Sequence, residues 1–200
     1  MKSNFRLTLL LILLTDALCA QTYITNVSVA DVVQHRWLHN QTVTISHELI
    51  TDIRPAQQAK IPANAIIVDG EGKYLIPGLV DAHIHFSQTG GLYTRPDAID
   101  LRKYKPYQEE IDWAHDHMEE VLRRYLQNGI TTVMDVGTTI NFLKHRDAFK
   151  DATYAPSIYM SGPLLTTYEP AALSNLGDDG PFSLVKTVED GLKMVQQQLQ

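Results

Sequence analysis

The chain has 200 residues, a formal net charge of −6 at pH 7, and a hydrophobic content of 44%. This hydrophobic content excludes an intrinsically disordered chain. The net negative charge and the lack of an extended cluster of Lys and Arg residues argue against nucleic acid as a partner. The single cysteine, Cys19, excludes a disulfide framework within the chain, so stability is expected to come from a packed core or from bound metal.

The first twenty residues predict an export signal. Lys2 and Arg6 form a short positive region, and residues 7–14 form an apolar run too short to span a bilayer as a stable helix. The segment Leu18-Cys19-Ala20 then places a small residue where a signal peptidase cuts. The mature protein is therefore expected to begin at Gln21.

A lipoprotein site is the alternative interpretation of the same segment, with Cys19 carrying the lipid. The three residues before this cysteine, Asp16, Ala17 and Leu18, match such a site poorly, so ordinary cleavage is favoured. We expect an exported protein, periplasmic or extracellular, that has no membrane attachment after signal removal.

Residues 21–76 predict a small β-sandwich. Short segments in this region are rich in β-branched and aromatic residues or alternate polar with apolar residues, and turn signals separate them. The expected strands cover residues 23–29, 42–45, 49–53, 65–68 and 74–76.

Residues 77–200 predict a parallel α/β arrangement that starts at Pro77-Gly78. Strands alternate with helices in this region, which is typical of a parallel sheet. Thr187 and Asp190 predict a capping box at the start of the last helix, and Asn128-Gly129 predicts a helix end. The first strand is nearly continuous in apolar residues, so it is expected to be buried on both faces. The expected strands cover 79–86, 130–137 and 156–162, and the expected helices cover 111–125, 139–150 and 187–200.

The stretch 166–181 is polar and contains glycine, so it is expected to be an exposed loop over one end of the sheet. Asp178 and Asp179 are interpreted as turn-forming residues rather than as ligands.

His83-Ile84-His85 is the most informative motif. Side chains on a strand alternate between its two sides, so His83 and His85 point the same way and can both reach one metal ion. Asp81 has the same parity but lies deeper in the strand, and we expect it to orient its neighbours. Two imidazoles on a buried strand are unfavourable because each needs hydrogen-bond partners.

His115-Asp116-His117 has the same spacing but lies in the predicted helix 111–125. Residues two apart on a helix lie about 200° apart, so these two rings cannot share an ion. With several acidic neighbours, the pair is expected to lie on a solvated helix face.

The run from Asp69 to His85 closely resembles the entry sequence of the amidohydrolase superfamily. Residues 129–137 resemble the second-strand segment of its imidazolonepropionase-like branch, and residues 159–163 resemble the third strand. The similarity covers about residues 23–200. A local departure is Ser46-His47-Glu48, which lacks the Asp-Gly turn usual in that strand pair.

The resemblance implies that residues 77–200 hold the first three strands and helices of a (β/α)8 barrel. It also implies that His83 and His85 are ligands of one or two divalent metal ions, of which zinc is the expected one. Family members hydrolyse amide, lactam or other C–N bonds with a metal-activated water. Their other ligands come from later strands, a lysine carbamate or glutamate on the fourth and histidines on the fifth and sixth. An aspartate on the eighth strand relays the proton.

A full barrel typically needs ~250 residues, which is more than this chain holds beyond Pro77. We therefore expect the gene to continue after Gln200, and we expect no catalytic and no cofactor-binding residue within this chain, which alone should be inactive. Should the chain alone prove active, Asp81 and Asp135 are the next residues to consider. The alternative is a degenerate, non-enzymatic remnant of such an enzyme.

The expected substrate is a small molecule or a short peptide. A cyclic amide and an X-Pro dipeptide are both open as substrates, and the sequence does not indicate the oligomeric state.

Overall fold

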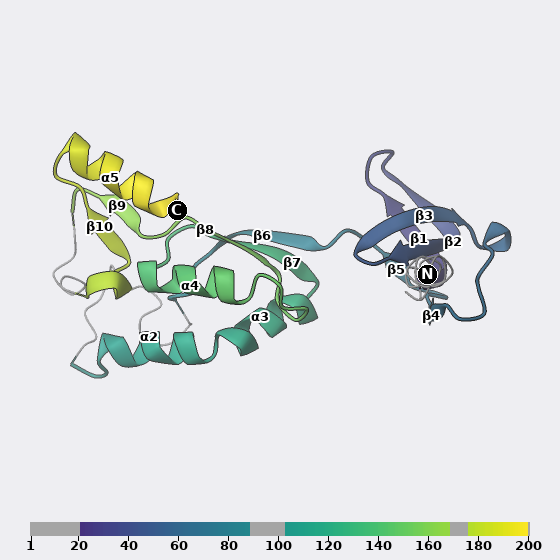
Figure 1. Cartoon of the computed structure of the whole chain (residues 1–200), viewed down its shortest axis with the longest axis horizontal. Coiled ribbons are helices and arrows are strands. Elements are labelled where there is room, and N and C mark those ends of the chain that lie inside the picture. Colours follow the sequence, from purple (N-terminus) through teal and green to yellow (C-terminus); the bar gives the residue numbers. More distant parts are fainter. Residues whose placement is uncertain (1–20, 89–102, 169–175, 200) are drawn as a thin grey trace, which may run out of the picture. The chain divides into compact units, whose positions relative to one another are not determined.

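The computed structural model describes residues 21–88, 103–168 and 176–199 (Figure 1). The predicted export signal, residues 1–20, lies outside the described residues. The chain divides into two compact units, Met1–Pro77 and Gly78–Gln200. In the described part of the chain, no helix is both long and apolar enough to cross a membrane.

The N-terminal unit contains a five-stranded sheet in which β1 is central. In the order β3-β2-β1-β4, β2 is antiparallel to β1 and β3, whereas β4 and the short β5 pair with β1 in parallel. All five predicted strands are confirmed, and Val27, Val29 and Val43 form the buried cluster. The described residues of this unit form one sheet and do not include the second layer of the predicted sandwich. The strands are β1 (Thr22–Asp31), β2 (Arg36–Ser46), β3 (Leu49–Pro55), β4 (Ile66–Asp69) and β5 (Tyr74–Leu75).

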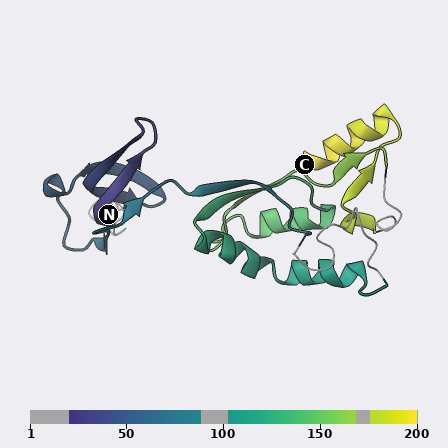
Figure 2. The same cartoon turned by 180° about the vertical axis from the view of Figure 1, so that it is seen from behind.

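The C-terminal unit contains a three-stranded parallel sheet in the order β6-β7-β8. Helices α2 and α3 lead from β6 to β7, and α4 leads from β7 to β8, so the predicted alternation of strand and helix is confirmed. These helices lie along the same side of the sheet (Figures 1 and 2). The elements are β6 (Leu79–Ile84), α2 (Tyr107–Asp116), α3 (Met118–Gln127), β7 (Ile130–Asp135), α4 (Ile140–Ala148) and β8 (Ser157–Met160).

The core of this unit lies between the helices and the sheet. Ile111, Leu122, Val133 and Phe142 are fully buried, and each such side chain contributes about 2 kcal/mol by leaving water. Ile84 joins the same cluster from the end of β6. The core therefore packs against the end of β6 that carries the histidine motif.

Beyond β8, the chain forms two short parallel strands, β9 (Leu164–Thr166) and β10 (Phe182–Leu184), that the sequence did not predict. A 3-10 turn, η4 (Gly177–Asp179), precedes β10, and α5 (Val188–Gln198) follows it. The predicted capping box of α5 is confirmed, since Asp190 N–H donates to Thr187 Oγ1 at 3.1 Å and Thr187 N–H donates to Asp190 Oδ2 at 2.9 Å.

The predicted single helix over 111–125 is wrong, because the helix is broken at His117 into α2 and α3. The backbone N–H of His117 and its ring Nδ1–H both donate to the carbonyl of Trp113, at 3.0 and 2.8 Å. The residue has φ −105° and ψ 13°, which lie outside the α-helical region. The apolar periodicity runs through the break, from Ala114 to Met118, so the sequence pattern did not reveal it.

The expectation that the first strand is buried on both faces is also wrong. Leu79 is 51% exposed and Val80 is 63% exposed, whereas Ile84 is buried. Within the described residues, β6 pairs with β7 alone, and the helix core reaches only the Ile84 end of the strand. The first half of β6 therefore lacks the packing that an inner parallel strand receives on both faces.

A partly buried polar cluster joins α2, α4 and η4. His115 Nδ1 lies 2.7 Å from His145 Nε2, and His115 Nε2 lies 3.4 Å from Asp179 Oδ1. Gln108 donates to the second oxygen of Asp179 at 3.1 Å. Two predictions are corrected here: His115 is not on a solvated helix face, and Asp179 is not exposed. Both side chains face the interior because α2 and α4 pack together and η4 closes over them.

Burial lowers the pKa of His145 to about 4, and the nearby charges of His115 and Lys144 act in the same direction. Burial acts to raise the pKa of Asp179, but hydrogen bonds, including one from His115, outweigh it and leave that pKa below its usual value. The lowered pKa of Asp179 stabilises the folded unit at neutral pH, and this contribution is lost as the pH falls. The lowered pKa of His145 instead penalises the protonated folded form, so it destabilises the unit as the pH falls below the ordinary histidine value.

The substitution His145→Gln is expected to flatten the acid dependence of stability. The unfolded wild type takes up a proton near the ordinary histidine pKa of 6.5, whereas the folded protein does so only near 4. The free energy of unfolding should therefore fall by on the order of 1–2 kcal/mol between pH 6.5 and 4 in the wild type, and by less in the variant. Urea unfolding across this pH range measures the free energy of unfolding of both proteins. His39→Gln, at an exposed position, should keep the wild-type slope, and equal slopes for His145→Gln and wild type would contradict the interpretation.

Gly78→Ala is expected to destabilise the C-terminal unit by about 1–3 kcal/mol. A Cβ at position 78 would lie only 2.7 Å from Cβ of Thr131 and would overlap the rest of that side chain. Adding Thr131→Ala should recover part of the loss. Gly191→Ala is the matched control, because its Cβ would make an ordinary 3.5 Å contact and alanine favours the helix. Chemical unfolding decides between these outcomes, and an unchanged midpoint for Gly78→Ala would show that the close approach is unimportant.

Candidate metal site

The structure brings His83 and His85 together at the carboxyl end of β6. Their ring centroids are 5.2 Å apart and the ring planes meet at 84°. His83 lies within the strand and is exposed, while His85 comes directly after its last residue and is partly buried. The two imidazoles are therefore neighbours. Metal ligation by them stays a prediction.

Asp135 ends the adjacent strand, β7, and its side chain is fully buried. The backbone N–H of Phe86 donates to its Oδ2 at 2.8 Å, and the N–H of Gly137 donates to its Oδ1 at 3.1 Å. One carboxylate thus holds the chain after β6 against the chain after β7. Sequence reasoning missed this role, although a carboxylate at the end of a predicted inner strand was a usable signal.

The electrostatics of Asp135 are dominated by burial, which raises the pKa of this carboxyl group above its ordinary value. The two backbone N–H groups and the charge of His85 oppose that effect. His85 Nδ1 lies 3.9 Å from Asp135 Oδ1, and this buried nitrogen has no hydrogen-bond partner within the described part of the chain. The site therefore pairs a buried carboxylate with a nearby imidazole nitrogen.

Asp81 does not join this group. Its Oδ1 accepts a hydrogen bond from the backbone N–H of His83 at 3.4 Å, and its side chain is half-buried within β6. This contact agrees with the expectation that Asp81 orients its neighbours.

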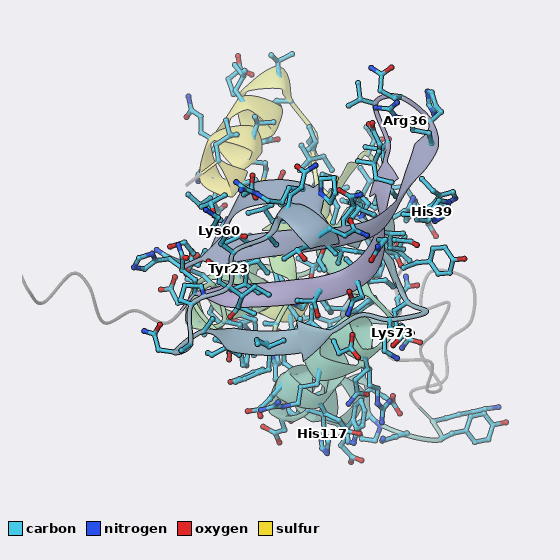
Figure 3. The ribbon with its side chains drawn as sticks, turned by 90° about the vertical axis from the view of Figure 1, so that its right-hand side faces the viewer. Tyr23, Arg36, His39, Lys60, Lys73 and His117 are labelled. Atoms are coloured by element: carbon cyan, nitrogen blue, oxygen red, sulfur yellow. The ribbon has the colours of Figure 1, made fainter. Side chains whose placement is uncertain are left out.

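The second histidine pair is separated. His115 bonds to His145 on α4, whereas His117 bonds to the carbonyl of Trp113 and stacks on its ring with centroids 4.2 Å apart. Figure 3 shows His117 at the periphery of the molecule. As expected from helical geometry, these two rings do not converge on a common point.

The donor set fits part of a divalent metal site. Imidazole nitrogens are zinc ligands, but catalytic zinc usually takes three protein ligands. Among the residues that the structure describes, no group of three or more His, Cys, Asp or Glu side chains is arranged to hold an ion. An ion held by His83 and His85 would thus need further donors besides these two.

A cavity of about 330 Å³ opens beside His85, between the end of β6 and helices α2 and α3. Its size suits a small ligand. Its lining includes His85, Gln88, Trp113, Met118, Arg124 and Tyr125.

Comparison of the sequence with known proteins finds one family match and several curated relatives. The model of the amidohydrolase family matches residues 74–196. Dihydroorotase of Staphylococcus aureus (strain MRSA252) is 36% identical over 63 residues, which cover 31% of this chain and 14% of the relative. Guanine deaminase of Escherichia coli (strain K12) is 31% identical over 85 residues, which cover 40% of this chain and 19% of the relative. The matches thus span less than a fifth of these curated relatives.

Solved structures share the fold. A putative prolidase from Bifidobacterium longum superimposes with a TM-score of 0.62 at 23% identity, over 90% of this chain and 38% of that one. A Xaa-Pro dipeptidase with bound methionine in its active site also gives a TM-score of 0.62, at 19% identity, over 90% of this chain and 44% of that one. At these identities, the likeness shows a common mixed α/β fold.

The family match covers more than half of the chain and includes Pro77-Gly78, both histidines of the β6 motif, and Asp135. The chain belongs to the amidohydrolase family.

Proposed function

We propose that this chain is part of an exported hydrolase that cleaves a C–N bond of a small molecule or dipeptide with a metal-activated water. The observation that carries the proposal is the His83–His85 ring pair at the carboxyl end of β6, inside the segment that matches the family. The names of the relatives, dihydroorotase, guanine deaminase and prolidase, support this substrate class.

The sheet β6-β7-β8 corresponds in this proposal to the first three strands of a (β/α)8 barrel. The five-stranded N-terminal sheet corresponds to part of a β-sandwich. The support comes from the parallel strand order, the helices between the strands, and superposition on prolidase structures over 90% of the chain. Active sites of such barrels lie at the carboxyl ends of the strands, where His83 and His85 are found.

When bound, a divalent ion such as zinc lowers the pKa of a coordinated water and polarises the bond to be cleaved. His83 and His85 would hold that ion through ring nitrogens. Asp135 keeps the ends of β6 and β7 together, so that the two rings are presented from a fixed backbone. The cavity beside His85 offers room for part of the substrate. In the proposal, the further ligands and the proton-relay aspartate lie on later strands.

His83→Ala and His85→Ala should each weaken zinc binding by the complete protein at least ~10-fold, because each removes one ligand. Metal content after dialysis and titration with a zinc-competing chelator measure the loss. His117→Ala is the control, since that ring bonds only to its own helix region. Full metal retention by both strand variants would refute the assignment. His115→Ala is not a suitable control, because it breaks the cluster with His145 and Asp179.

The export proposal predicts a mature chain that begins at Gln21 and carries no lipid. It is supported by the positive residues and the short apolar run that precede this position. Intact mass of the exported form, expressed from the natural reading frame, gives the answer. A lipid-modified Cys19 at the N-terminus would contradict it.

A further inference from the structure

The ring of His85 rests against the chain that continues from β7. A Cβ added to Gly137 would lie 3.0 Å from Cε1 and 3.1 Å from Nδ1 of this ring. These distances are shorter than ordinary carbon contacts, which begin near 3.5 Å. The absence of a side chain at position 137 thus allows the imidazole to occupy its place.

The buried edge of the same ring faces Asp135. Among the residues that the structure describes, the buried Nδ1 of His85 has no hydrogen-bond partner, and leaving a buried polar group in that condition is costly. The carboxylate oxygen Oδ1 of Asp135 is 3.9 Å away. A shift of about 1 Å gives an ordinary hydrogen bond.

Asp135 is itself held rigidly. Its two oxygens accept the N–H groups of Phe86 and Gly137, and its own backbone lies in the sheet between β6 and β8. Both carboxylate oxygens are thus already engaged by backbone N–H groups, and the side chain is fully buried. Its geometry suits a group that orients a ligand.

We propose that Asp135 and Gly137 form a seat for His85, in which the ring donates its Nδ1–H to Asp135 and keeps Nε2 free for the metal. This inference rests on the proposed function and deepens it. Metal-bound histidines commonly donate their other ring N–H to a carboxylate, which fixes the tautomer and raises the basicity of the ligating nitrogen. Asp135 is thus a positioning residue, and Gly137 leaves space for the ring.

The seat explains the choice of an aspartate over an asparagine. An asparagine at 135 would present an NH2 group to one of the two backbone donors that the carboxylate now accepts, the N–H of Phe86 or the N–H of Gly137. Two donors would then face each other without an acceptor. Asp135→Asn therefore keeps the size of the side chain but removes one of its two acceptor oxygens and its negative charge.

The test uses the complete protein with and without zinc. Nitrogen NMR of the metal-free protein reports which ring nitrogen of His85 carries the proton in its neutral form. The wild type should be protonated at Nδ1, and Asp135→Asn should shift the proton toward Nε2. Zinc affinity, measured against a competing chelator, should fall about 10- to 100-fold in this variant. Gly137→Ala should weaken zinc binding by a smaller factor, because its neighbours need to move by only tenths of an ångström.

Asp147→Asn is the matched control, since that aspartate is exposed on α4 and bonds only to Arg146. It should change neither the tautomer nor the zinc affinity. A folded Asp135→Asn variant with wild-type tautomer and affinity would overturn the seat. Should that variant fail to fold, a wild-type His85 protonated at Nε2 in the metal-free protein would overturn it equally.

The outcomes separate the seat from the proposed function. Loss of zinc in His85→Ala without loss in Asp135→Asn removes the seat and leaves the metal site intact. Full zinc retention in His85→Ala contradicts the proposed function itself. A changed tautomer in Asp135→Asn, together with weaker zinc binding, supports both.

Discussion

The C-terminal unit depends on the buried carboxylate of Asp135. Its side chain accepts the backbone N–H groups of Phe86 and Gly137, and its main-chain carbonyl accepts the N–H of Ser161 at 2.9 Å. One residue at the end of the central strand therefore joins the chain segments that come after all three strands. Burying a carboxylate is costly unless donors compensate it, and the two side-chain bonds offset part of that cost.

This constraint explains why the candidate site lies where it does. The strands β6, β7 and β8 are parallel, so their carboxyl ends meet at one edge of the sheet. The histidine motif, the aspartate and the glycine against which His85 rests all lie at that edge. Because Asp135 holds two of the strand ends together, the imidazoles project from backbone that is bonded to β7 and, just after β6, to the side chain of Asp135. A metal site needs such rigidity, since ligand positions must be held closely.

The cluster of His115, His145 and Asp179 shows a different solution to the burial of polar groups. It lies between helices, and its members bond mainly to one another and to Gln108. Asp135 instead bonds to backbone N–H groups. The first arrangement joins α2, α4 and η4 through side chains that titrate, so its strength depends on pH. The second joins a carboxylate to backbone N–H groups, which do not titrate.

Local patterns in the sequence determined the strands of the two larger sheets, most helices, the capping box at Thr187 and the spacing of the β6 histidines, because each depends on neighbouring residues. The tertiary structure alone decided the break at His117, the burial of His115 and Asp179, and the exposure of the first half of β6. It alone also decided the role of Asp135. The contact of Phe86 with Asp135 spans 49 residues and that of His115 with Asp179 spans 64. Such contacts form only when separate strands and helices pack together, and no local periodicity encodes which side chains then meet.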